Sequence, residues 1–464
     1  MTSYDLVPYP SLPRPQTHPG HLAALASLFG LNPPPVTHCR VLDLGCGDGS
    51  NLIPMAVQLP DSQFVGLDLA AGQIAAGQQV ISALGLKNIT LRAMNLLEVE
   101  ANLGQFDYII SYGVYSWTPP PVRDKLLAIC RKHLAADGVA YISYNVYPGW
   151  HLHQMAREMM LYHTRQAGEP AQRAAQARLL LNFLAEAAPA LLGRLPTNKA
   201  YSLFLSDEQQ FLHDQPDAYL LHDLLEEVNQ PVYFYQFMEY AARHGLQFLA
   251  EADFSTMMTS HFLPVQIAQP LRELAQTGLE MEQYMDFLRN RAFRQTLLCH
   301  QEAILDRELK PERLANLYVA SPAKPEADQP DLHSTAPEKF VGLNGVSLTV
   351  SQPVSKAALF YLARQWPQTT AVAALPLAAQ QLLEPEAAPV YSAAGLARAA
   401  RQLGETLLAA FALNLVELSA LPTCCPPGLP EYPVANPLAR YQAQTGQASV
   451  TNQRHEPVPL ADDL

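Results

Sequence analysis

The stretch "RVLDLGCGDGSN" at residues 40–51 decides the fold that this sequence predicts. Its first half is a short apolar run typical of a buried strand, and its second half places glycine at alternate positions, Gly45, Gly47 and Gly49. Because glycine has no Cβ, the backbone there can turn sharply and approach a ligand closely. A helix pattern begins near Asn51 and points its free N–H groups at the same loop. Strand, glycine loop and helix predict a ligand site beyond the carboxyl end of the strand.

The residues that follow repeat this alternation. Further apolar runs lie at 64–69, 89–94, 106–111 and 139–144, and helix patterns lie at 52–59, 73–84 and 122–134. Near-continuous apolar strands separated by helices predict a parallel sheet covered on both faces. We therefore expect residues 1–150 to form a doubly wound, Rossmann-like α/β domain.

The pattern changes after Trp150. Residues 151–230 are helical throughout, and 231–254 read as helix, glycine stop and strand, which predicts an additional edge strand that completes the sheet. Another helical stretch is expected at 281–309, so 151–325 form a helical insertion or regulatory region. Residues 320–338 have the Pro, Ala and acidic composition of a linker.

The last region, 326–464, is predicted to be a small α+β, winged-helix-like domain. Asn344-Gly345 lies between alternating apolar residues, which indicates a hairpin, and helices near 356–364 and 396–411 precede a short strand "NLVELS". This region holds 7 Lys/Arg against 12 Asp/Glu. A DNA-binding domain should be basic, so the balance favours protein contacts.

Composition narrows the function classes. The 464 residues are 49% hydrophobic with a net charge of −13, which argues against nucleic acid as the main partner. No apolar run of about 18 residues predicts a membrane span, and the start lacks the pattern of a signal peptide. Six cysteines show no C-x-x-C spacing, so we expect no zinc site and a cytoplasmic location. The spacing of His151, His153 and His163 suits no metal site either. The sequence is compatible with a homodimer.

Two cofactors compete for the glycine loop. Dinucleotides prefer G-x-G-x-x-G, whereas this loop reads G-x-G-x-G, and the carboxylate of Asp43 just before it would repel a pyrophosphate. The same carboxylate would attract the ammonium of a methionine moiety, which favours S-adenosylmethionine. Asp68 ends the second strand, where an acid takes ribose hydroxyls. Asn95 follows the third strand, where a neutral amide would accept weakly from the adenine amine. The expected cofactor-binding residues are Asp43, Gly45, Gly47, Gly49, Asn51, Asp68, Leu69, Asn95, Leu96 and Tyr112.

The motifs "YPSLPRPQTHP" (9–19), "GVYSW" (113–117) and "LLHDLLEEVNQPVYFYQFMEYA" (220–241) add a resemblance. With the glycine loop, they resemble bacterial class I methyltransferases carrying a methyltransferase regulatory domain, among them protein lysine methyltransferases that modify outer-membrane proteins. The resemblance implies that Tyr9, Thr17 and His18 fold over the cofactor. It also shows two departures: Asn95 replaces the family's usual Asp, and His222-Asp223 stands where His-Glu is frequent.

Aromatic residues cluster where a methyl acceptor would enter. Tyr112, Tyr115 and Trp117 follow the fourth strand, and Tyr144, Asn145, Tyr147 and Trp150 follow the fifth. Their rings would line an apolar channel that lowers the cost of deprotonating a lysine and holds its cationic form; alternatively, they pack under the helical insertion. Tyr115, Trp117, Tyr144, Asn145 and Tyr147 are the expected catalytic residues. The "SYGVYSW" segment lacks the Asn/Asp-Pro-Pro-Tyr element of DNA methyltransferases, so base methylation is not expected.

The leading hypothesis is a methyltransferase that uses S-adenosylmethionine to modify lysine side chains of a protein substrate. The alternatives are a small-molecule methyltransferase, or a regulatory protein that binds S-adenosylmethionine without turnover.

Overall fold

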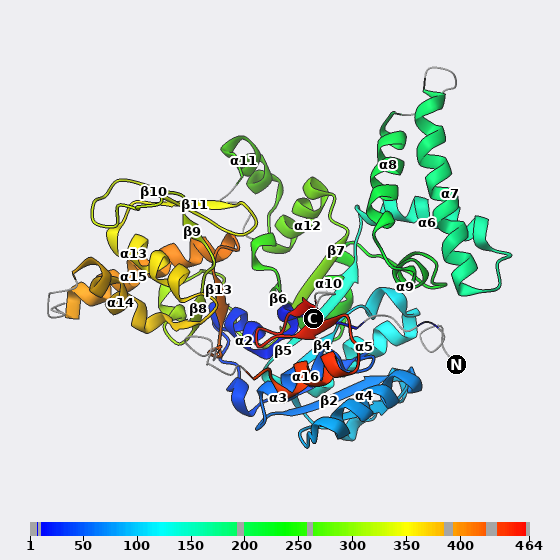
Figure 1. Cartoon of the computed structure of the whole chain (residues 1–464), viewed down its shortest axis with the longest axis horizontal. Helices are drawn as coiled ribbons and strands as arrows, with labels where there is room; N and C mark the ends of the chain where they lie inside the picture. The colour runs from blue at the N-terminus through cyan, green and yellow to red at the C-terminus, as the bar shows by residue number, and fades with distance from the viewer. Residues whose placement is uncertain are drawn as a thin grey trace.

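The computed structural model describes Val7 and residues 11–192, 199–257, 263–384, 393–423 and 434–460 of the chain. Within these ranges a central sheet carries helices on both faces, and a helical arm and a smaller α+β unit extend from it on opposite sides (Figure 1).

The central sheet has seven strands in the order β3-β2-β1-β4-β5-β7-β6. They are β1 (Arg40–Leu44), β2 (Gln63–Asp68), β3 (Ile89–Ala93), β4 (Phe106–Ser111), β5 (Leu134–Asn145), β6 (Leu246–Glu251) and β7 (Phe293–His300). Strands β1 to β5 pair in parallel, and β7 runs antiparallel to both β5 and β6. The chain order reverses beside β1, so the carboxyl ends of β1 and β4 frame a ligand crevice. The predicted doubly wound α/β fold is confirmed.

Alternation along the strands divides the hydrophobic residues between the two faces. Val41, Tyr108 and Ile110 pack into one core, whereas Leu42 and Ile109 pack into the other. The first core includes α2 (Pro19–Leu28) and α3 (Leu52–Gln58), and the second includes α5 (Pro120–His133) and α10 (Phe234–Arg243). Helix α4 (Ala71–Leu84) ends at Gly85, which adopts the left-handed conformation of a helix cap.

The helix expected at 281–309 is wrong over most of its length. Helix α12 (Gly278–Arg289) ends at Asn290, whose φ is 49°, and the chain then enters β7. The apolar run at 296–299 is fully buried between β5 and β6. A short apolar run does not distinguish a buried strand from a buried helix by its periodicity. The segment forms a strand because β5 and β6 pair with it on its two edges.

The middle region forms an arm that projects from the sheet (Figure 1). Its helices are α6 (Trp150–Thr164), α7 (Pro170–Leu191), α8 (Lys199–His213), α9 (Asp217–Tyr219) and the π-helical turn η6 (Leu220–Leu224). Leu181, Leu205, Leu212 and Leu220 give the arm a hydrophobic core of its own. Helix α11 (Val265–Leu274) precedes α12.

The C-terminal unit holds two three-stranded sheets and a helical layer. The sheets are β8 (Tyr318–Ala320) with β12 (Thr370–Ala371) and β13 (Glu417–Ser419), and β9 (Lys324–Pro325) with β10 (Glu338–Val341) and β11 (Ser347–Val350). The helices are α13 (Pro353–Gln365), α14 (Leu375–Leu383) and α15 (Ala393–Ala412). The unit is α+β, as the sequence predicts. Its strand pairing begins at Tyr318, before the expected boundary at 326.

The segment expected to be a linker is ordered: it contains β9, and a loop follows β9 up to β10. The amine of Lys356 is fully buried and donates to the backbone carbonyls of Asp331, Ser334 and Ala336. A buried ammonium needs such partners, so the loop is held against α13.

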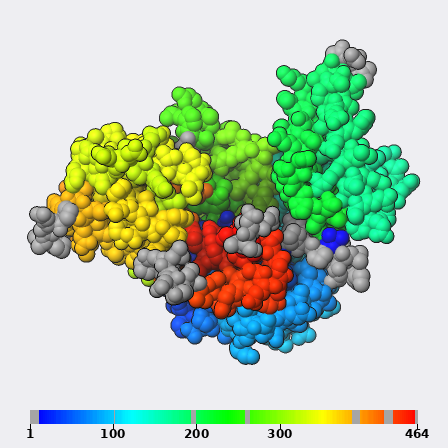
Figure 2. Space-filling view, viewed as in Figure 1, coloured from blue at the N-terminus to red at the C-terminus, as the bar shows by residue number. Residues whose placement is uncertain are grey.

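The last described segment returns to the central α/β unit. It comprises helix α16 (Pro437–Gln444) and the hairpin of β14 (Ser449–Thr451) and β15 (Pro457–Pro459). Helix α16 contacts α4 and His455 contacts Asn51, whereas Arg454 pairs with Glu417 of the C-terminal unit. In Figure 2 this red segment covers the blue residues, between the yellow C-terminal unit and the green arm.

Candidate active site

The glycine loop is held in place by the end of β2. Gly45 has φ +84° and donates its N–H to the Leu67 carbonyl at 2.7 Å, and Gly47, with φ +57°, donates to Asp68 Oδ2 at 2.8 Å. A Cβ on Gly45 would lie 2.3 Å from the Val114 side chain, so only glycine fits. Gly49 (φ +79°) closes the loop. The backbone therefore approaches the crevice without a side chain in between.

Asp43 lies beneath this loop and is 3% exposed. Burial, followed by the charge of Asp68, raises the pKa of the Asp43 carboxyl to about 7, and a hydrogen bond from Asn51 opposes the shift. Burial of a carboxylate without a cation disfavours its charged form. A ligand ammonium at this position would restore the ionised state, so the geometry suits a cationic group.

The ends of β2 and β3 present the other predicted polar groups. The two carboxylate oxygens of Asp68 accept from the backbone N–H groups of Gly47 and Ala70, at 2.8 Å each. Leu69 beside it is 60% exposed. Asn95 caps the short helix η3 (Leu96–Glu98) by accepting from Leu97 N at 3.0 Å. Leu96 is buried below it.

An N-terminal strap, described at Val7 and residues 11–17, passes over the crevice. Arg14 donates its backbone N–H to Asn51 Oδ1 at 2.9 Å, and its guanidinium lies 4.7 Å from the centre of the Tyr112 ring. Thr17 is buried and accepts from Asn51 Nδ2 at 3.0 Å. The strap thus joins the helix after the glycine loop to the residue after β4.

Of the other two predicted strap residues, the structure describes His18. His18 caps α2, since its Nδ1 accepts from Gly20 N at 3.1 Å, and burial lowers its pKa to about 4. Tyr9 lies outside the described residues.

Two of the predicted channel residues belong to the core. Tyr115 and Tyr144 are 2% and 1% exposed, and both rings pack on Phe237 of α10. The Tyr144 hydroxyl shares a hydrogen bond of 2.9 Å with Thr296 Oγ1. For these two rings the structure favours packing over the channel, because α10 and β7 cover them completely.

The other predicted channel residues lie under the helical arm. Asn145 is buried and donates to Asn229 Oδ1 at 3.1 Å. Trp117 meets Trp150 edge-on at 6.1 Å, and the half-buried Tyr147 stacks on His151 at 4.0 Å. They lie between the end of β5 and the arm.

Sequence reasoning missed a cluster beside Tyr112. Burial raises the pKa of Tyr112, the charge of Arg14 lowers it, and the charge of Asp223 raises it. The charge of Asp223 also raises the pKa of Tyr219. Its neighbour His222 pairs with the strap, since Nε2 lies 2.6 Å from the Val7 carbonyl. The resemblance had indicated position 223 only as a departure from the family.

Histidines of the arm pair with side chains rather than forming a metal centre. His151 Nε2 lies 3.2 Å from the Tyr233 hydroxyl, and His153 Nδ1 lies 3.0 Å from Glu208 Oε2. Among the described residues, no cluster of three or more His, Cys, Asp or Glu side chains could hold a metal ion. The four described cysteines are buried as free thiols, and Cys424-Cys425 lies outside the described ranges.

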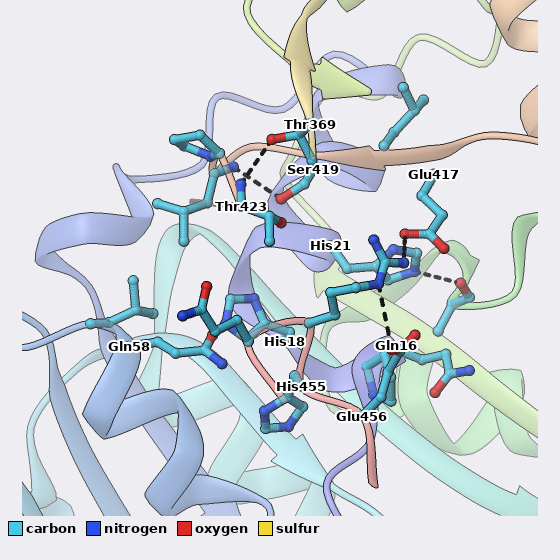
Figure 3. A pocket seen from close by; sticks show the side chains of 18 of the residues that line it. Gln16, His18, His21, Gln58, Thr369, Glu417, Ser419, Thr423, His455 and Glu456 are labelled. Atoms are coloured by element: carbon cyan, nitrogen blue, oxygen red, sulfur yellow. Dashed lines mark hydrogen bonds and ion pairs between the residues drawn. The ribbon is translucent and has the colours of Figure 1, made fainter. Parts of the chain in front are cut away.

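A cavity of about 790 Å³ lies behind the strap, between α2, the end of α3 and the C-terminal unit. His18 and His455 face Ser419 and Thr423 across it (Figure 3). Among the described lining residues, neither Asp43 nor the loop glycines contribute to its wall. The cavity and the cofactor crevice are therefore separate spaces, with Asn51 and His455 between them.

The sheet order, the glycine loop and the carboxylates that end β1 and β2 define a class I methyltransferase. Family models agree: "Methyltransferase domain" matches residues 41–138, "Predicted methyltransferase regulatory domain" matches 216–300, and "PKMT, C-terminal winged helix domain" matches 431–463.

Whole-chain comparisons give the family. PKMT2 from Rickettsia typhi, solved in complex with AdoHcy, is similar over 98% of this chain and 86% of its own, with 31% identity and a TM-score of 0.83. Uncharacterized protein RP789 from Rickettsia prowazekii is 40% identical over 77% of this chain, and the match spans 64% of that protein's length. Uncharacterized protein RP028 from the same organism is 39% identical over 53% of this chain and 96% of its own.

The chain therefore belongs to the family of class I methyltransferases with a methyltransferase regulatory domain that includes the rickettsial PKMT2. The AdoHcy bound by that relative and the methyltransferase domain imply S-adenosylmethionine as the cofactor. Within the described ranges, every helix is too short or too polar to cross a membrane.

Proposed function

We propose that this chain transfers methyl groups from S-adenosylmethionine to lysine side chains of a protein substrate. The observation that carries the proposal is that Tyr112 directly follows β4, next to β1, and that the charge of Asp223 acts on Tyr112 and on Tyr219. An acidic group among aromatic rings suits a cationic side chain.

The cofactor would lie along the ends of β1, β2 and β3. Asp43 would hold the methionine ammonium beside the glycine loop. Asp68 would accept from ribose hydroxyls at the end of β2, and Asn95 would meet the adenine amine. The bound cofactor supplies a methyl group on a positively charged sulfur, so the protein has mainly to position the acceptor, an effect of up to about 7–11 kcal/mol.

A lysine acceptor must first lose a proton. With an ordinary pKa near 10.4, this costs about 4.6 kcal/mol at pH 7. Asp223 would hold the ammonium and receive that proton, and Tyr112, whose pKa is raised, stays protonated and can donate a hydrogen bond. Trp117 and Tyr147 would flank the alkyl chain. The amine lone pair then forms the N–C bond while the C–S bond breaks, and S-adenosylhomocysteine leaves.

The arm and the C-terminal unit would provide the surface for the protein substrate. The arm's exposed apolar side chains, such as Leu179 and Phe183 on α7, support this part of the proposal. A small-molecule acceptor would need neither the arm nor the C-terminal unit as a docking surface.

The test is to incubate the purified chain with methyl-labelled S-adenosylmethionine and lysate from its source. Base-stable label on protein, located on lysine by mass spectrometry and lost in Asp43→Ala, would support the proposal. Label confined to the small-molecule fraction would refute it in favour of a small-molecule methyltransferase. If the cofactor binds and neither fraction is labelled, a regulatory protein without turnover becomes the better interpretation.

A further inference from the structure

The hairpin turn between β14 and β15 has a constrained backbone. Asn452 Oδ1 accepts from the backbone N–H groups of Arg454 at 2.8 Å and Glu456 at 3.0 Å, and Asn452 N donates to the Glu456 carbonyl at 3.0 Å. Between them His455 has φ +61°, a left-handed conformation that is uncommon for residues other than glycine. The turn thus fixes the direction of the His455 side chain.

His455 points into the wall between the cavity and the cofactor crevice. It is 1% exposed, and its Nε2 lies 2.9 Å from Asn51 Oδ1. The amide oxygen can only accept, so Nε2 carries the hydrogen and donates. Burial, followed by the nearby His18, lowers the pKa of His455 well below its ordinary value. The imidazole is therefore a neutral donor.

Asn51 is the point where three distant parts of the chain meet. Its Oδ1 accepts from the backbone N–H of Arg14 and from His455, and its Nδ2 donates to Thr17 Oγ1. These contacts fix which way the amide faces, because an N–H group from Arg14 requires the oxygen on that side. The same side chain stabilises the ionised form of Asp43 by a hydrogen bond.

The residue before His455 anchors the turn on its other side. The Arg454 guanidinium lies 4.1 Å from the centre of the Trp366 ring and pairs with Glu417, both in the C-terminal unit. Arg454 and His455 therefore connect the C-terminal unit to the first βα unit.

We propose that His455 is a positioning residue of the cofactor site: the C-terminal hairpin supplies a neutral N–H donor that holds the Asn51 amide beside Asp43 and under the strap. The inference rests on the proposed placement of the methionine end of the cofactor at Asp43. It adds a role for the C-terminal segment in cofactor binding, in addition to any contact with substrate.

A matched pair of variants tests it. His455→Gln keeps an N–H donor and His455→Leu removes it, and both must adopt the same left-handed backbone. We expect His455→Leu to weaken S-adenosylhomocysteine binding, measured by calorimetry, about tenfold, and His455→Gln to stay within about twofold of wild type. In His455→Leu the KM for S-adenosylmethionine should also rise, while kcat at saturating cofactor stays within about twofold of wild type. Equal affinities for the two variants would overturn the inference.

A double-mutant cycle with Asn51→Ala separates positioning from general damage. In the Asn51→Ala background, His455→Leu should weaken binding no further, because its partner is already gone. An additional loss as large as in the wild-type background would contradict the inference. The exposed His38→Leu serves as the surface control. Asp43→Ala tests whether the methionine end of the cofactor lies at Asp43. Unchanged affinity in that variant would refute this orientation of the cofactor. None of these binding measurements depends on the methyl acceptor.

Discussion

Asp43 and Asp68 end neighbouring parallel strands, and the pair holds two carboxyl groups at one edge of the sheet. Burial and the charge of Asp68 together raise the pKa of Asp43 from 3.8 to about 7. Asp68, in contrast, has backbone N–H donors on both oxygens. The raised pKa of Asp43 in the unliganded protein makes cofactor binding sensitive to pH.

The affinity for S-adenosylhomocysteine should fall below pH 7. Only ionised Asp43 attracts the ligand ammonium, so each pH unit below its pKa should cost about tenfold in affinity. The linkage to stability has the opposite sign: a raised carboxyl pKa stabilises the unliganded fold at low pH, and this contribution is lost as the pH rises through about 7. Calorimetry between about pH 5.5 and 8.5 measures the first effect. The Asp43→Asn variant should bind S-adenosylhomocysteine weakly, with an affinity that does not change with pH over this range.

Gly45→Ala should disrupt both folding and cofactor binding. The new Cβ would lie 2.3 Å from Val114 at a φ of +84°. Gly85→Ala is the matched control, since φ is +66° and no atom lies within 4 Å of the added Cβ. We expect the control to lose about 1 kcal/mol of unfolding free energy from backbone strain alone. Gly45→Ala should lose about 2–4 kcal/mol in the same denaturant titration. Equal losses would mean that the Val114 side chain moves away at little cost.

Asn95→Asp should tighten cofactor binding by about fivefold, because a charged acceptor forms a stronger hydrogen bond with the adenine amine. The cap on η3 should survive, since Asp and Asn cap helices equally well. Calorimetry with S-adenosylhomocysteine gives the affinity, and thermal unfolding reports the cap. Weaker binding with an unchanged melting temperature would show that Asn95 does not meet the adenine.

Asp223→Asn should slow methylation of a lysine acceptor by about a hundredfold near neutral pH, because the amide cannot receive the proton. The loss should shrink as the pH rises, since solvent then deprotonates the lysine. The KM for S-adenosylmethionine should not change. Asp223→Glu, which restores the residue that the resemblance leads one to expect, is the control and should retain most of the activity. A rate loss that is constant with pH would assign Asp223 to binding alone.

The parallel part of the sheet could be predicted because each strand is a continuous apolar run ended by a loop signal, as in residues 40–51. Strand β7 could not, since its identity depends on partners on both edges and not on its own periodicity. Likewise, composition marks residues 320–338 as a linker, but the buried amine of Lys356 orders part of that segment.

The candidate site likewise contains some residues that can be placed from the sequence and others that cannot. Asp43 and the glycines can be placed from local sequence, because the loop and strand that position them are contiguous. Aromatic residues can be assigned to the end of the right strand but not to its exposed side, so Tyr115 and Tyr144 were expected in a channel and lie in the core. No local signal marks His455, since its partner Asn51 is 404 residues away.

That separation has a consequence for the order of events during synthesis. Asn51 leaves the ribosome 404 residues before His455. The α/β unit has all of its first five strands long before the C-terminal hairpin emerges, but the amide beside Asp43 still lacks one of its donors. On the proposed role of His455, the newly made chain would reach full cofactor affinity only after the hairpin is translated.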